Sequence, residues 1–117
     1  MSSKENAAMF QLFDLLESRY ALRTLWVLRD HRPQTFRLLQ DSLGGVTPNT
    51  LNTRLKALRE AGWIEHGKQG YRLTAAGIDL VKRVSDLHAF AGRWANGRAA
   101  AGAAAPAAGA LPAESAA

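Results

Sequence analysis

The feature that most constrains the fold is a helix that the sequence delimits at both ends, residues 47–61. Thr47 is a good N-cap, and Pro48 is favoured at the first helical position because a helix start leaves its N–H groups unpaired. Gly62 supplies a C-terminal stop. The apolar face of this helix recurs every three or four residues, at Leu51, Leu55 and Leu58. The segment is therefore expected to anchor on a core through its leucines.

Apolar periodicity predicts four further helices, at residues 4–17, 19–30, 36–43 and 74–94. Ser18 is the expected N-cap of the second helix and Pro33 its end, because a residue before proline is pushed out of the α region. Gln34 and Thr35 are expected to form a short extended piece. Two short strands, at 63–66 and 71–73, flank the turn residues Gly67, Lys68, Gln69 and Gly70, which is a hairpin signal.

The helix at 36–43, the Gly44-Gly45 turn and the helix at 47–61 follow the order of a helix-turn-helix, and the hairpin adds a wing. The expected fold class is mostly α with a small β-hairpin wing, a winged helix-turn-helix. Opposite the leucines, the helix at 47–61 presents short polar and basic side chains that suit base edges and phosphates. The predicted DNA contacts are Thr47, Asn49, Thr50, Asn52, Thr53, Arg54 and Lys56, with Lys68 and Arg72 from the wing. For Arg54, which lies beside the buried stripe, a structural ion pair is the alternative role.

Basic residues are concentrated where this interface is expected. The whole chain has a net charge of +5, and the window from Arg19 to Arg59 holds eight Lys or Arg against two Asp, a balance of 8 − 2 = +6. Such a balance points towards double-stranded DNA, although a solvated basic face is equally consistent with charge alone. The alternative function is a winged-helix protein-interaction module without DNA binding, because a fold does not fix a function. RNA is a weaker third option, since no exposed aromatic platform is evident.

Several classes of function are not supported by the sequence. The chain has no Cys, which excludes disulfides, thiolate metal sites and thiol redox sensing. The three histidines are far apart and have no acidic neighbours at ligand spacing, so we expect no metal and no other cofactor. No nucleophile motif is present, so we expect no enzyme. Without a signal peptide or an apolar run of membrane length, the chain is expected to be cytoplasmic.

The two outer helices carry more apolar surface than one small domain needs, which predicts a homodimer. The alternative is that the two helices pack only on each other within one chain. The predicted interface residues are Phe10, Phe13, Leu16, Val84, Leu87, Phe90 and Trp94.

Residues 1–95 are thus expected to form the DNA-binding domain with its dimerisation helices. Residues 96–117, of which twelve are Ala, are expected to be a disordered tail. Three tryptophans are expected in the core, at positions Trp26, Trp63 and Trp94.

Residues 22–80 resemble the HxlR-type winged-helix regulators, with a looser likeness to the MarR and PadR groups. The matching pieces are Trp26-Val27-Leu28, Thr35-Phe36, Gly45-Val46-Thr47, Leu51-Asn52-Thr53-Arg54-Leu55, Ala61-Gly62-Trp63-Ile64 and Tyr71-Arg72-Leu73-Thr74-Ala75-Ala76-Gly77. The resemblance implies a bacterial transcription regulator and leaves any small-molecule effector unknown. Three features depart from the family: its usual cysteine is missing, Thr35 replaces a basic residue, and the wing is shorter.

Overall fold

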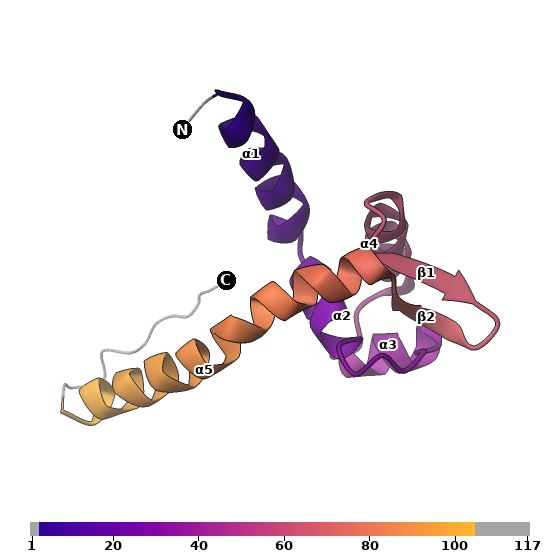
Figure 1. The fold of residues 1–117 in the computed structure, drawn as a ribbon. Helices are drawn as coiled ribbons and strands as arrows, with labels where there is room; N and C mark the ends of the chain where they lie inside the picture. The colour runs from indigo at the N-terminus through magenta and orange to yellow at the C-terminus, as the bar shows by residue number, and fades with distance from the viewer. Residues whose placement is uncertain (1–2, 105–117) are drawn as a thin grey trace. The chain divides into compact units, whose positions relative to one another are not determined.

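The computed structural model describes residues 3–104, which form five helices and one antiparallel hairpin (Figure 1). The elements are α1 (Ser3–Glu17), α2 (Ala21–Val27), α3 (Phe36–Ser42), α4 (Pro48–Glu60), β1 (Ile64–Gly67), β2 (Gly70–Leu73) and α5 (Ala75–Ala104). The chain divides into two compact units, residues 1–82 and 83–117, so that α5 contributes to both. Within the described residues, no helix is both long and apolar enough to cross a membrane.

One hydrophobic core holds the first unit together. It is built mostly of leucine and takes side chains from α2, α3, α4, both strands and the start of α5. Its buried members from the elements are Ala21, Leu25, Leu39, Leu51, Leu55, Leu58, Ile64, Tyr71, Leu73 and Val81. The three leucines of α4 are nearly or completely buried, as the sequence predicts, so they fix which face of α4 turns outward.

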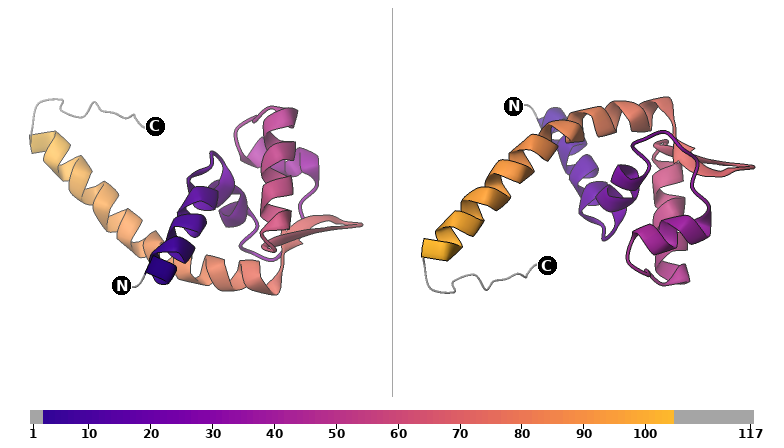
Figure 2. Two further views of the ribbon diagram at one scale, coloured as in Figure 1. Left: turned by 90° about the horizontal axis from the view of Figure 1, so that it is seen from above. Right: turned by 90° about the horizontal axis from the view of Figure 1, so that it is seen from below.

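The helix-turn-helix is confirmed, and local signals define both of its helices. Thr35 caps α3 by accepting from the N–H of Leu38 at 3.2 Å, and Thr47 caps α4 with Pro48 in the first turn. The intervening turn uses Gly44 and Gly45, whose φ values of +82° and +80° are in the left-handed region that glycine adopts without strain. Figure 2 shows α3 crossing α4 and the hairpin projecting from the helices of the first unit.

The wing is also confirmed, with a register that pairs Ile64 with Leu73 and Gly67 with Gly70. The predicted extended piece before α3 is present too. Gln34 forms an isolated antiparallel β-bridge with Tyr71, so that the segment leading into α3 pairs with β2 at one position.

The second helix is shorter than the sequence predicts, at both ends. Ser18 does not cap it: its hydroxyl donates to the carbonyl of Asp14 in α1 at 3.2 Å, and the N-cap is Tyr20 in a left-handed conformation. The helix ends at Val27, well before Pro33, because the side chain of Asp30 accepts from the N–H of Arg32 at 3.3 Å and so stabilises a turn.

The last helix is longer than predicted and places Trp94 differently. It continues through residues 96–104, which the sequence assigned to a disordered tail, because the high helix propensity of alanine outweighs two glycines. The rest of that predicted tail lies outside the described residues. Trp94 was expected in the core, but it is 54% exposed, and the guanidinium of Arg98 lies 5.1 Å from its ring centroid. Trp26 and Trp63 do pack against the core.

Candidate nucleic-acid interface

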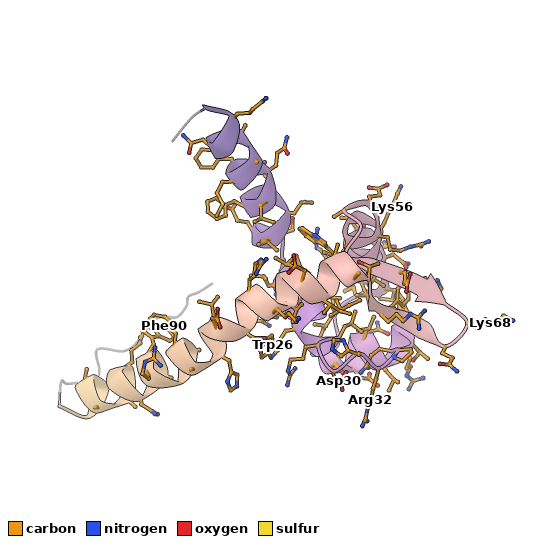
Figure 3. The ribbon with its side chains drawn as sticks, in the orientation of Figure 1. Trp26, Asp30, Arg32, Lys56, Lys68 and Phe90 are labelled. Atoms are coloured by element: carbon orange, nitrogen blue, oxygen red, sulfur yellow. The ribbon has the colours of Figure 1, made fainter. Side chains whose placement is uncertain are left out.

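The exposed side of α4 carries the predicted polar face, which we define as Asn49, Asn52, Thr53 and Lys56. All four residues are exposed, and they lie opposite the buried leucines of the same helix. The orientation is therefore fixed by the core rather than by the polar residues themselves. Asparagine can make two hydrogen bonds to an adenine edge, and lysine can reach guanine or phosphate. Figure 3 shows Lys56 extending away from the body of the first unit.

Two further predicted contacts, Thr47 and Thr50, are engaged in starting the helix. The hydroxyl of Thr47 accepts from the N–H of Thr50 at 3.4 Å and donates to the hydroxyl of Thr50 at 2.9 Å. Thr47 is exposed, whereas Thr50 is half-buried. Because these hydroxyls already bond each other, the polar face is the better-placed set of groups for DNA.

Arg54 differs from its neighbours on α4. Its side chain is half-buried, and its Nε donates to the backbone carbonyl of Arg19 at 2.6 Å. The predicted alternative was a structural ion pair, but the partner in the structure is a carbonyl oxygen and not an acid. The two terminal nitrogens of the guanidinium are left for other partners.

The wing holds the two remaining predicted contacts in different environments. Lys68 is exposed at the tip of the hairpin (Figure 3). Arg72 pairs with Glu65 across the strands at 2.8 Å, with both side chains at least half exposed. An exposed pair of this kind contributes little stability, about 0–1 kcal/mol, so Arg72 can be drawn to a phosphate at small cost.

An open groove of about 560 Å³ lies between the second half of α4 and β1. It adds Arg59 and His66, which are not among the predicted DNA contacts, to the candidate interface. Its lining includes Lys56, Arg59 and His66, and the carboxylates of Glu60 and Glu65 offset the two positive charges. Arg59 follows Lys56 by three residues, a helical spacing that would have placed both on one side. The predicted hairpin places His66 on the wing near Arg72, but its position in the groove depends on the register, in which its ring stacks on that of Tyr71 with the centroids 4.0 Å apart.

The described residues contain no group of three or more His, Asp or Glu side chains placed to hold a metal ion. Taken together, the exposed face of α4 and the hairpin form one basic, polar surface.

Comparison with known proteins identifies the family. Residues 15–99 match the family model of the HxlR-like helix-turn-helix. The chain belongs to that family. Among curated proteins, none matches this chain.

Two solved structures share the fold. Quinone-bound YodB from B. subtilis is 26% identical, with a TM-score of 0.67 over 74% of this chain and 98% of that one. A protein of the MarR family of transcriptional regulators from Porphyromonas gingivalis W83 is 17% identical, with a TM-score of 0.67 over 78% of this chain and 95% of that one. The HxlR-like chain is therefore a DNA-binding transcription regulator with a winged helix-turn-helix, and not an enzyme.

Proposed function

We propose that this HxlR-like protein binds specific double-stranded DNA sequences as a homodimer, with α4 in the major groove. The observation that carries the proposal is the polar face of α4, which stands exposed opposite three buried leucines. A helix of this kind fits the width of the major groove, where each base pair presents a distinct pattern of donors and acceptors.

In this proposal the interface residues divide the work. Asn49, Asn52 and Thr53 contact base edges, because short amides and hydroxyls discriminate between bases. Phosphates are contacted by side chains whose charge suits any sequence: Lys56 and Arg59 from α4, and Lys68 and Arg72 from the wing. Thr47 and Thr50 lie at the N-terminus of α4, where backbone N–H groups favour a phosphate.

The homodimer is supported by apolar side chains that stay exposed on two helices. On α1, Phe10 is 61% exposed and its ring lies edge-on to that of Phe13, with the centroids 6.1 Å apart. On α5, Leu87 and Phe90 are 55% and 53% exposed, and Trp94 is exposed to a similar degree. Burying such groups against a second copy removes them from water. Leu16 and Val84, the other two predicted interface residues, are half-buried and lie beside these groups along α1 and α5.

A second subunit also answers a need of DNA recognition. One recognition helix covers too few base pairs for strong specificity, and two-fold symmetry doubles it, with half-sites about 34–36 Å apart. As for effectors, the neighbour YodB is quinone-bound. This chain has no Cys, so a small molecule would have to act on it without a covalent bond to a thiol.

The test is fluorescence anisotropy with duplexes from the region upstream of the gene, each titrated over a series of salt concentrations. We expect the logarithm of the association constant to fall linearly with the logarithm of the salt concentration, because phosphate contacts release counterions. A duplex of shuffled sequence serves as the control and should bind more weakly. Absence of binding to any duplex at low salt would favour the protein-interaction module instead.

A further inference from the structure

A single side chain connects the recognition helix to the start of the fold. Arg54, in the second turn of α4, reaches across to the junction between α1 and α2 and donates its Nε proton to the carbonyl of Arg19 at 2.6 Å. The two residues are 35 positions apart. A hydrogen bond from a charged donor is shorter and stronger than a neutral one, so this contact fixes both partners.

The junction that Arg54 contacts is conformationally strained. Tyr20 has a φ of +73°, in the left-handed region that a bulky residue rarely adopts. Three interactions hold it there besides Arg54 itself. The buried Thr24 donates its hydroxyl proton to the Tyr20 carbonyl at 2.6 Å, the Thr24 N–H donates to the same oxygen at 2.9 Å, and the Arg19 guanidinium lies 5.0 Å from the Tyr20 ring centroid. Such strain persists only where the surroundings over-determine it.

The neighbouring carbonyls explain why Arg54 finds an acceptor here. The Ser18 carbonyl accepts from the N–H of Ala21 at 3.0 Å, and the Tyr20 carbonyl is taken by Thr24. The Arg19 carbonyl lies between these two, and in the structure it is Arg54 that donates to it. This hydrogen bond is exposed, so without Arg54 the carbonyl would bond to water, and what the side chain adds is a charge-assisted contact between α4 and the junction.

We infer that Arg54 is a positioning residue, which sets the recognition helix against the α1–α2 junction instead of acting mainly as a phosphate contact. The inference rests on the proposed function, since it assigns Arg54 a role within that same DNA-binding site. It has a second consequence: because α1 ends at this junction and carries part of the proposed dimer surface, Arg54 couples the placement of α4 to that of α1.

Salt dependence separates this role from a phosphate contact. Each neutralised phosphate contributes about 0.9 to the slope of log affinity against log salt. Removal of a side chain that contacts a phosphate therefore makes the slope less steep, and lysine can replace such a side chain as a point charge. A positioning arginine behaves differently, because the affinity falls while the slope is kept, and lysine does not restore the contact that Nε makes.

The experiment compares Arg54→Met and Arg54→Lys with the matched control Lys56→Met, in the full chain. Methionine keeps an apolar stem and removes the donors, and far-UV circular dichroism checks that each variant folds. We expect Arg54→Met to lose about tenfold or more in affinity for the specific duplex with an unchanged slope, and Arg54→Lys not to recover it. Lys56→Met should make the slope less steep by about 1.8, which is 0.9 for each subunit of the proposed homodimer.

Hydrogen exchange in the free protein provides a readout that does not require DNA. The amides of residues 21–24 should exchange faster in both Arg54 variants and at the wild-type rate in Lys56→Met. The inference is overturned if junction exchange is unchanged, or if Arg54→Met makes the slope less steep by about 1.8 and Arg54→Lys restores both slope and affinity. Should the wild type fail to bind DNA, the proposed function is lost, and the exchange rates alone still decide whether Arg54 holds the junction.

Discussion

The backbones of Gln34 and Tyr71 are joined by two hydrogen bonds, from the Gln34 N–H to the Tyr71 carbonyl at 2.8 Å and back at 2.7 Å. This pair ties the wing to the segment that leads directly into α3. The wing and the helix-turn-helix are consequently held by backbone contacts, and not only by apolar packing. Lys68 at the wing tip thus keeps a defined place relative to α4.

The close approach at Gln34 predicts that Gly70 cannot be replaced. Gly70 has a φ of +127°, and a Cβ there would overlap the backbone carbonyl of Gln34. We expect Gly70→Ala to lower the free energy of unfolding by about 1–3 kcal/mol, measured by urea denaturation. DNA affinity should fall as well, because the wing is displaced.

Gly67 is the matched control, since it pairs with Gly70 in the hairpin. A Cβ at Gly67 would meet nothing within 4 Å, and its φ is not in the left-handed region. Gly67→Ala should therefore change the free energy of unfolding by less than about 1 kcal/mol. Equal losses for the two variants would show that the Gln34 contact is unimportant.

The second prediction concerns the asparagines of the polar face. Asn49→Ala and Asn52→Ala should each cost about 1–3 kcal/mol of binding free energy on the specific duplex and leave random DNA nearly unaffected. Competition between the two duplexes measures this difference. The control is Asn96→Ala, which removes an exposed asparagine from α5. Equal losses on specific and random DNA would refute base recognition by these amides.

The third prediction concerns Arg59 in the groove between α4 and β1. Arg59→Gln should weaken binding to all sequences alike and make the salt slope less steep by about 1.8, 0.9 for each subunit, because Arg59 lines the groove beside Lys56. Arg93→Gln removes the same charge from the exposed surface of α5 and should leave the slope nearly unchanged. A slope that falls equally in both variants would indicate a general charge effect instead of a phosphate contact.

Local signals in the sequence were sufficient for the helix-turn-helix. The Thr47-Pro48 start, the leucine stripe and the Gly62 stop all act within one or two helical turns, so the bounds of α4 follow from them. The polar face is then determined by helical geometry alone. The hairpin likewise follows from its turn residues, although its pairing with Gln34 does not.

Features that depend on distant residues were not predictable. Ser18 looked like a cap for α2, but it bonds back to α1, and the N-cap is Tyr20 in a left-handed conformation. The apolar character of Trp94 suggested burial, yet burial needs a covering surface, and the described part of its own chain leaves it exposed. Sequence periodicity identifies the apolar face of a helix, but it does not identify the surface that packs against that face.

The last prediction follows from those exposed apolar groups. We expect the wild-type protein to scatter light at micromolar concentration as a dimer, at twice the chain mass of 12.7 kDa. Leu87→Asp or Phe13→Asp should give a monomer, because a carboxylate buried in an apolar interface is strongly unfavourable. DNA affinity should fall too, although neither residue lies on α4, because the second recognition helix is lost.

Leu38→Asp is the control: this leucine of α3 is also half exposed but lies outside the apolar stripes of α1 and α5, so its variant should stay dimeric. A wild-type monomer that remains monomeric on DNA would contradict the homodimer, and apolar stripes that cover each other within one chain would then be the better account.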